Sequence, residues 1–248
     1  MEGPEFPTLP PESRQKDGAR NARGLARERM PHCPMKFRSA RGKLLMLSPH
    51  ILDIGCGNGS PSLTKKWFPG CRYAGADIQR YNQSDADVAA MDEFYQLGAD
   101  GSGYDAIPEA SYDFLILNHV IEHMSEPAPI VAKLCAKLKP GGYIWIAFPS
   151  QRSLTLPHSV DETLNFYDDP THVYLPKVEE VAEVLRANGV TVIDAGRSRE
   201  GFWTTVGDVV KFLKRWIKKL VTGKFSGRGM WYLMGFEDHV FGQRRPDR

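Results

Sequence analysis

Residues 51–59, ILDIGCGNG, are the stretch that decides the fold of this chain. A short apolar run that carries Asp53 leads directly into three alternating glycines, Gly55, Gly57 and Gly59. Because glycine has no Cβ, it lets the backbone turn sharply and approach a ligand closely. The stretch therefore predicts a buried strand followed by a ligand-binding turn.

Short apolar runs and helical stretches alternate along the rest of the chain. Strands that alternate with helices form a mostly parallel sheet that is covered on both faces. We therefore predict a doubly wound α/β domain over residues 36–248. The predicted strands are Ile51–Ile54, Tyr73–Ala76, Phe114–Leu117, Tyr143–Phe148 and Val190–Ile193, with helices such as 129–138 and 177–188 between them.

Composition excludes several classes of protein. The sequence contains no apolar run of about 18 residues, so we expect no membrane-spanning helix. The N-terminus lacks the layout of a signal peptide, so secretion is not expected. The four cysteines, at positions 33, 56, 71 and 135, have no CxxC pairing and no metal-ligand spacing. We therefore expect a cytoplasmic protein with reduced thiols and no metal site.

The formal net charge of +2 conceals a strong asymmetry. Residues 1–43 carry ten Lys and Arg against five acids, and residues 207–248 carry ten against four. The middle of the chain is therefore acidic, whereas a nucleic-acid-binding protein concentrates positive charge around its cleft. We expect no nucleic-acid partner. Residues 1–35 are rich in Pro, Gly and Arg, and this composition predicts a disordered basic segment.

Two acids near the glycine turn restrict the identity of the ligand. Asp53 would repel a pyrophosphate and attract an ammonium group. The G-x-G-x-G spacing also differs from the G-x-G-x-x-G of dinucleotide-binding turns, which makes a dehydrogenase a distant alternative. Asp77, at the end of the second predicted strand, can accept both hydroxyls of a ribose. The ligand then has a ribose, a positively charged end and no phosphate, and S-adenosylmethionine fits all three features.

These residues resemble those of the class I S-adenosylmethionine-dependent methyltransferases of the small-molecule type, similar to the ubiquinone-biosynthesis and glycan-cluster enzymes. The resemblance covers roughly residues 44–200. The resemblance implies a Rossmann-like seven-stranded sheet whose last strand, near His239–Gln243, is antiparallel and lies at the edge of the sheet. Four blocks carry it in order: ILDIGCGNG (51–59), AGADI (74–78), SYDFLILNHVIEHM (111–124) and LKPGGYIWIAFP (138–149).

The resemblance also implies the cofactor contacts. Asp53 would hold the amino-acid end, directly or through water, and Asp77 would take the ribose. Ile78 would pack on the adenine, and an acid after the third strand would meet the adenine amino group. Asp92 fits that last position best, with Asp105 as the alternative, although this connection is longer than usual. The glycine turn would line the methionine part through the backbone of Gly55, Cys56, Gly57 and Gly59.

The block after the fourth strand carries the residues nearest to the chemistry. Asn118 and His119 lie where the methionine part of the cofactor and the methyl acceptor should meet. We expect both to contact the cofactor, and His119 is also a candidate catalytic group. Glu122 and His123 lie a turn further on, so at least one of them is expected to be structural.

A second candidate base lies after the fifth strand. His172, in DDPTHVYLP (168–176), would hang over the acceptor pocket from a loop, and His158 is a weaker candidate on the same loop. Either histidine has an alternative role as a hydrogen-bonded loop anchor. A histidine suits a hydroxyl acceptor because its pKa is near neutral. We slightly favour O-methylation of a small-molecule or lipid-linked acceptor.

Residues 207–228 are predicted to insert an amphipathic helix, Val209–Val221, before the last strand. Such a helix either docks on the core of its own protein or lies on an anionic membrane surface or a partner. The second interpretation would place the protein peripherally at the inner membrane surface. Its apolar face carries Val209, Val210, Leu213, Trp216, Ile217, Leu220 and Val221, and its basic face Lys211, Lys214, Arg215, Lys218 and Lys219.

Two functions from different classes follow from these motifs. The first is an active methyltransferase that works by in-line displacement. The second is a catalytically inactive cofactor-binding scaffold of the same fold. The intact Asp53, glycine turn and Asp77 favour the first, because a scaffold has no physical need for them.

Overall fold

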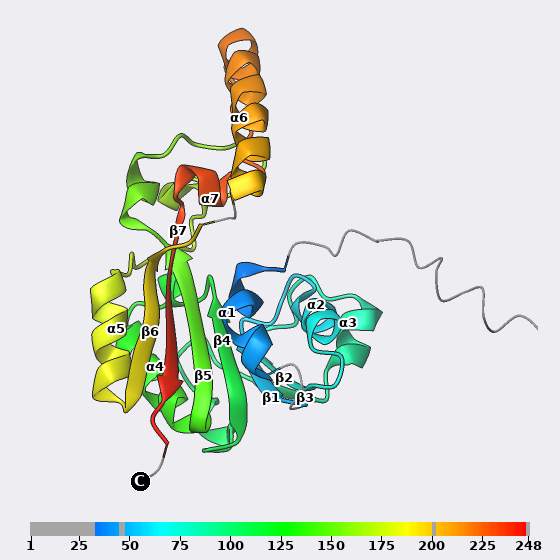
Figure 1. Ribbon diagram of the computed structural model, residues 1–248, viewed down its shortest axis with the longest axis vertical. Helices are drawn as coiled ribbons and strands as arrows, with labels where there is room; N and C mark the ends of the chain where they lie inside the picture. The colour runs from blue at the N-terminus through cyan, green and yellow to red at the C-terminus, as the bar shows by residue number, and fades with distance from the viewer. Residues whose placement is uncertain (1–32, 45–47, 200–201, 247–248) are drawn as a thin grey trace, which may run out of the picture. The chain divides into compact units, whose positions relative to one another are not determined.

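A seven-stranded sheet lies at the centre of the part of the chain that the computed structural model describes (Figure 1). Its strand order is β3-β2-β1-β4-β5-β7-β6, and only β7 runs antiparallel to its neighbours. The predicted doubly wound α/β class with an antiparallel last strand is confirmed. The expected edge position of that strand is wrong, because β7 pairs with both β5 and β6 and β6 forms the edge. The strands are β1 His50–Ile54, β2 Arg72–Asp77, β3 Glu93–Gln96, β4 Tyr112–Asn118, β5 Leu138–Pro149, β6 Val190–Arg197 and β7 Glu237–Arg244.

The described residues are 33–44, 48–199 and 202–246. The predicted disordered segment, residues 1–35, therefore lies outside them except for its last three residues. Residues 34–248 form one compact unit.

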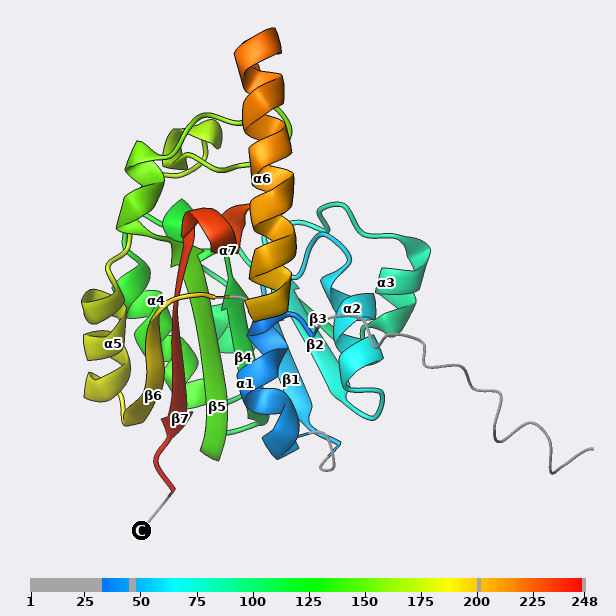
Figure 2. The same ribbon diagram turned by 45° about the horizontal axis from the view of Figure 1, so that its top comes forward.

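Helices cover both faces of the sheet. Figure 2 shows α1 in front of the sheet and α4 behind it. The helices are α1 Met35–Leu44, α2 Ser60–Trp67, α3 Asp85–Ala90, α4 Pro127–Lys137, α5 Val178–Ala187, α6 Phe202–Thr222 and α7 Trp231–Met234. Short 3-10 turns are η1 Tyr104–Ala106, η2 Ile121–His123, η3 Gln151–Thr155 and η4 Phe166–Asp168.

The alternation of side chains along β1 separates the core from the polar side of the sheet. Leu52 and Ile54 belong to the main hydrophobic cluster, which includes Leu134 of α4 and Leu185 of α5. Successive residues of a strand point to opposite faces, so Asp53 faces the side that α1 covers. β1 thus places the acid Asp53 on one face of the sheet, while Leu52 and Ile54 on its other face pack in the core.

Helix α6 extends away from the end of the sheet (Figures 1 and 2). It begins at Phe202, before the predicted start at Val209. Phe212 and Trp216 pack against a small separate cluster formed by Leu156, Leu164, Phe225 and Phe236. The rest of its apolar side is exposed, with exposed fractions between 41% and 82% for Val209, Val210, Leu213, Ile217, Leu220 and Val221.

Asp87 joins the two short helices beside the glycine turn. Its carboxylate accepts hydrogen bonds from the backbone N of Ser62 in α2 (3.3 Å) and from Ser84 N (2.9 Å) and Ser84 Oγ (2.6 Å) at the start of α3. Hydrogen bonds from Ser62 and Ser84 lower the pKa of Asp87 to about 2. The ionised carboxylate therefore stabilises the packing of α2 on α3.

We expect Asp87→Asn to lower the free energy of unfolding by about 1–2 kcal/mol at pH 7, because the amide is a weaker acceptor of these hydrogen bonds. The folded-state pKa lies below the unfolded value of about 3.9, so the contribution is complete above that pH and is lost as the pH falls towards 2. Urea unfolding at pH 7 and at pH 2.5 measures it. A difference between wild type and variant that is as large at pH 2.5 as at pH 7 would contradict this assignment.

Candidate active site

The glycine turn lies at the carboxyl end of β1 and is closely covered. Gly55 and Gly59 have positive φ values of 73° and 72°, which favour glycine. A Cβ on Gly57 would lie 2.8 Å from the carbonyl oxygen of Tyr81, and a Cβ on Gly55 would lie 2.5 Å from Cγ2 of Val120. The loops after β2 and β4 therefore both close on this turn, and the turn accepts no larger residue at these positions.

Asp53 is buried beneath the turn, with 1% of its surface exposed. Its Oδ2 accepts hydrogen bonds from Ser60 Oγ (2.6 Å) and Tyr73 OH (2.9 Å). Lys36 of α1 donates to Ser60 Oγ (2.6 Å), and its Nζ lies 4.0 Å from Asp53 Oδ2. Asp53 thus ties the first residue of α2 to β1 and takes its countercharge from α1. A cofactor ammonium group at Asp53 would have to share this carboxylate with Lys36, a residue that sequence reasoning missed.

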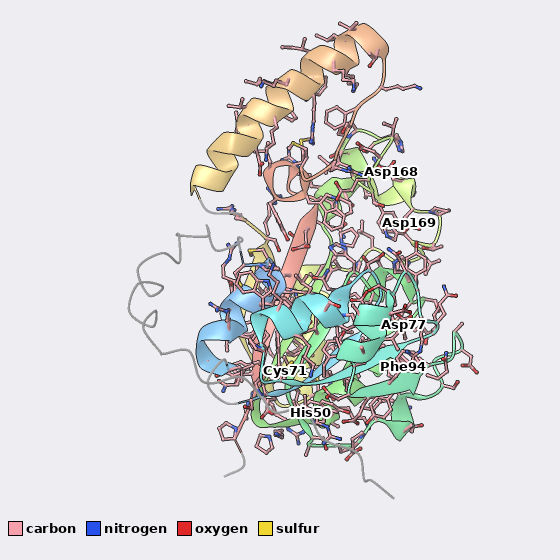
Figure 3. All side chains as sticks on the ribbon, turned by 90° about the vertical axis from the view of Figure 1, so that its right-hand side faces the viewer. His50, Cys71, Asp77, Phe94, Asp168 and Asp169 are labelled. Atoms are coloured by element: carbon pink, nitrogen blue, oxygen red, sulfur yellow. The ribbon has the colours of Figure 1, made fainter. Side chains whose placement is uncertain are left out.

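Asp77 ends β2 at the same edge of the sheet. Its Oδ1 accepts a long hydrogen bond from Gln79 N (3.4 Å). Burial raises the pKa of Asp77, and backbone hydrogen bonds from Gln79 and Ile78 oppose the rise. The half-buried carboxylate can still accept further hydroxyl donors, and the neighbouring Ile78 offers an apolar side chain that is 53% exposed. In the view of Figure 3, the loop that carries Asp168 and Asp169 lies above Asp77.

The remaining residue of the turn, Cys56, is held in place by Gln83 from the loop after β2. Cys56 is buried, and Gln83 Nε2 donates to its carbonyl oxygen (3.1 Å). Burial and the nearby carboxylate of Asp53 raise the pKa of the Cys56 thiol to about 12. The thiol is therefore protonated and acts as a packing group, which leaves only the backbone of Cys56 for ligand contact.

Asp92 does not lie after the third strand, the position that the sequence pattern predicted for it. It precedes β3, and its Oδ2 accepts hydrogen bonds from Tyr73 N (2.7 Å) and Lys65 Nζ (2.6 Å). Gln96, and not Asp92, pairs with Asp77, so Asp92 is at the opposite edge of the sheet. The expectation that Asp92 follows the third strand is wrong because the apolar stretch before it is the end of α3 and not a strand.

Two other acids, Asp100 and Asp105, do follow β3 along the chain. Asp105 lies in η1, is 86% exposed and pairs with Lys133 (3.2 Å). Asp100 follows β3 by four residues, is exposed and accepts a hydrogen bond from Ser102 N (3.0 Å). Sequence reasoning did not consider Asp100, although its place in a Gly-Ala-Asp-Gly turn directly after a strand was a usable signal.

At the carboxyl end of β4, the side where the methyl acceptor is expected, Asn118 ends the strand and His119 follows it with a φ of 57°. Both ring nitrogens of His119 are hydrogen-bonded: Nδ1 to Glu122 Oε1 (3.0 Å) and Nε2 to Glu237 Oε2 (2.9 Å). Burial would lower the pKa of His119, but the hydrogen bonds and charges of Glu122 and Glu237 raise it to about 10. His119 is therefore an imidazolium between two carboxylates, with no lone pair for an incoming proton.

Glu237 is a part of this cluster that sequence reasoning missed. It is the first residue of β7 and is 2% exposed. Among the described residues, its Oε1 and the Oε2 of Glu122 have no hydrogen-bond partner. One imidazolium and two carboxylates leave a net negative charge in this buried cluster.

The loop that carries His172 is docked on the turn after β4. Val173 N and Tyr174 N both donate to the carbonyl oxygen of Glu122, at 3.0 and 3.1 Å. His172 is 5% exposed at its side chain, and its ring lies 5.0 Å from that of His123. The weaker candidate, His158, is exposed and bonds Asp168 Oδ1 (2.6 Å) within its own loop.

Comparisons with known proteins identify the family of the chain. The sequence model of the methyltransferase domain family matches residues 23–195. A ubiquinone biosynthesis O-methyltransferase of Nitrosococcus oceani is 27% identical over 119 residues, which are 46% of this chain and 49% of the relative. A trans-aconitate 2-methyltransferase of Paracidovorax citrulli is 32% identical over 110 residues, 44% of this chain and 42% of the relative. The chain thus spans about half the length of the curated relatives it matches.

Solved structures share the fold. An S-adenosylmethionine-dependent methyltransferase from Mesorhizobium loti superposes with a TM-score of 0.59 at 13% identity, covering 84% of this chain and 97% of that one. One from Archaeoglobus fulgidus gives a TM-score of 0.51 at 20% identity, covering 84% and 92%. Because the family model covers more than half of the chain, this protein belongs to the methyltransferase domain family, and its resemblance to class I S-adenosylmethionine-dependent methyltransferases is confirmed.

Proposed function

We propose that this protein transfers the methyl group of S-adenosylmethionine to a small-molecule or lipid-linked acceptor, and that a hydroxyl oxygen is the favoured acceptor atom. The observation that carries the proposal is the closely covered glycine turn beside the half-buried carboxylate of Asp77, both at the carboxyl ends of neighbouring strands. This edge is where ligands bind in open α/β sheets. The name of the O-methyltransferase relative supports the choice of oxygen.

The residues at this edge fit the parts of the cofactor. The backbone of Gly55, Cys56 and Gly57 would line its methionine part, and Gly59 would complete the turn. Asp77 would accept the ribose hydroxyls, and the exposed Ile78 would pack on the adenine. Asp100 replaces Asp92 as the proposed acceptor for the adenine amino group, because it lies in the loop after β3.

The chemistry asks the protein mainly for alignment. When bound, the cofactor supplies a methyl group whose bond to the sulfonium sulfur breaks towards sulfur as the acceptor attacks. Asn118 and the fixed imidazolium of His119 border the acceptor side and would orient the two reactants, which is worth several kcal/mol of the barrier. His119 has no nitrogen free to take a proton, so we propose that the proton of a hydroxyl acceptor leaves on the side of His172.

We expect Asp77→Ala to weaken the binding of S-adenosylhomocysteine about 5- to 150-fold, because the ribose hydroxyls lose a charged acceptor worth roughly 1–3 kcal/mol. Asp100→Asn should cause a smaller loss. Asp92→Asn is the matched control, since its partners lie at the opposite edge, and its affinity should be unchanged. Calorimetric titration gives all three affinities. A normal affinity for Asp77→Ala would remove Asp77 from the ribose site.

Methyl transfer itself is expected with at least one class of hydroxyl acceptor. The assay follows label from the methyl donor into phenols, catechols, carboxylates and amines. Transfer to amines alone would overturn the preference for oxygen. Binding of the cofactor without transfer to any class would favour the inactive scaffold, and no cofactor binding would remove both functions.

We further propose that α6 rests on an anionic membrane surface. None of the described helices has the length and hydropathy needed to cross a bilayer. The exposed apolar residues of α6 lie beside exposed basic residues such as Lys214 and Lys218. A helix with this division buries its apolar side among lipid headgroups while its cations meet anionic lipid.

A basic hollow beside the C-terminal half of α6 supports an anionic occupant. It has a volume of about 410 Å³. Arg215, Lys218 and Lys224 supply three cations, and Thr222 and Ser226 supply hydroxyls. The cations complement a lipid phosphate, whereas the hydroxyls of Thr222 and Ser226 already donate to the carbonyl oxygen of Lys218 (2.9 Å) and to Asp161 Oδ2 (2.6 Å).

We expect the protein to sediment with vesicles that contain anionic lipid and to remain in solution with neutral ones. Lys214→Gln with Lys218→Gln should weaken binding about 30-fold, since each cation near the surface contributes about 1 kcal/mol at low salt. Leu220→Ser with Val221→Ser should weaken the binding that persists at high salt. The charge-matched control is Lys66→Gln with Lys133→Gln, both exposed and far along the chain from α6. Equal recovery of the α6 variants and this control would exclude the membrane contact.

A further inference from the structure

Three potential metal ligands meet beside the proposed acceptor side. Glu122 and His123 come from η2, and His172 comes from the loop that docks on it. A carboxylate oxygen of Glu122 and one ring nitrogen of each histidine all lie within 4.8 Å of one another. No motif spacing in the sequence predicts this cluster, because two of the ligands are adjacent residues and the third lies 49 positions further along.

Hydrogen bonds fix the tautomer of His123. Its Nδ1 lies 2.9 Å from Thr171 Oγ1 and 3.3 Å from the carbonyl oxygen of Thr171. The hydroxyl proton of Thr171 is already donated to Asp169 Oδ1 (2.6 Å), so Thr171 Oγ1 accepts from His123. Nδ1 therefore carries the proton, and Nε2 keeps a lone pair for a ligand.

His172 is fixed in the same way. Its Nδ1 lies 2.7 Å from the carbonyl oxygen of Phe166, which can only accept. Nδ1 is therefore the donor and Nε2 again keeps its lone pair, with Asp169 Oδ2 at 3.9 Å. Metal-binding histidines characteristically donate their second ring N–H to a carbonyl, hydroxyl or carboxylate oxygen, which orients the ring.

The carboxylate of Glu122 completes the set. One of its oxygens is occupied by His119, while the other is buried and has no partner among the described residues. A buried carboxylate oxygen without a donor is costly.

We propose that Glu122, His123 and His172 bind one divalent transition-metal ion. Two imidazole nitrogens and one carboxylate oxygen suit Zn²⁺ and its neighbours in the first row. Around a tetrahedral ion the ligand atoms lie about 3.4 Å apart, so separations of up to 4.8 Å have to shorten by up to about 1.4 Å. The exposed side chain of His123 can make that movement. Three protein ligands leave a fourth position open, as in catalytic metal sites.

The open position gives the ion a role that rests on the proposed methyl transfer. A hydroxyl acceptor bound there would release its proton to water, because a divalent ion lowers the pKa of a bound oxygen. The resulting oxygen anion would attack the methyl carbon while the electron pair of the carbon–sulfur bond passes to sulfur. This assigns proton removal to the ion, with His172 as its ligand and not as a base.

The test is metal binding by the full-length protein, which does not depend on methyl transfer. After treatment with a chelator, the protein is titrated with Co²⁺ and followed by visible absorption, and with Zn²⁺ by calorimetry. We expect one equivalent to bind with micromolar or tighter affinity and visible bands of four- or five-coordinate Co²⁺. The near-ultraviolet thiolate bands of cysteine-bound Co²⁺ should be absent.

Variants locate the site. His123→Ala and His172→Gln should each weaken Zn²⁺ binding at least tenfold, and the exposed position of His123 makes a folding defect in that variant unexpected. His158→Gln, on the same loop but outside the cluster, is the matched control and should bind normally. No stoichiometric binding, or equal affinity in His123→Ala and His158→Gln, would overturn the site and leave the proposed methyl transfer untouched.

Discussion

The buried carboxylate of Asp53 is the constraint around which the glycine turn, the proposed cofactor-binding side of the sheet, is organised. Burying an unpaired carboxylate costs several kcal/mol, so a strand that carries one into the sheet needs partners at hand. The partners come from three elements: Lys36 from α1, Ser60 from α2 and Tyr73 from β2. Burial and the charge of Asp53 raise the pKa of Tyr73 well above its usual range, so the phenol remains a donor. Satisfying one charge thereby fixes the position of two helices and the glycine turn between them.

A second buried charge cluster organises the acceptor side in the same way. His119 follows β4, yet one of its two carboxylates belongs to β7, 118 positions away. Val120, the residue after His119, covers the glycine turn above Asp53, because a Cβ on Gly55 would lie only 2.5 Å from its Cγ2. This contact brings the proposed methyl donor and acceptor edges together. Oriented, buried charges of this kind need little reorganisation during a reaction, which is how protein sites favour charge movement.

The sequence predicted the features that are local in the chain. Parallel strands, the glycine turn and Asp77 follow from short patterns of apolar residues and glycines, and each lies where it was expected. The acid after the third strand was misplaced because α3 has only six residues, too few to reveal a helical period. An apolar stretch of four residues there satisfies a strand and a helix equally well.

The missed residues share a different cause. Lys36 reaches Asp53, and Glu237 reaches His119, through packing that depends on the order of elements in the sheet. No pattern along the chain encodes that order. The tautomers of His123 and His172 are equally invisible, since they are set by oxygens of Thr171 and Phe166 in a loop without regular structure.

Helix α6 shows that the two interpretations of an amphipathic helix need not exclude each other. Its Trp216 packs on Phe225 and carries Lys219 above its ring, so Trp216 belongs to the docked side and not to the exposed apolar side. The exposed side remains a contiguous apolar strip of a kind that monomeric proteins seldom leave uncovered. The cluster that holds α6 also contains Phe236, whose ring stacks on His119. The surface proposed to meet the membrane and the edge proposed to meet the acceptor therefore rest on one hydrophobic cluster, so that a change in the packing of α6 would reach His119 through Phe236.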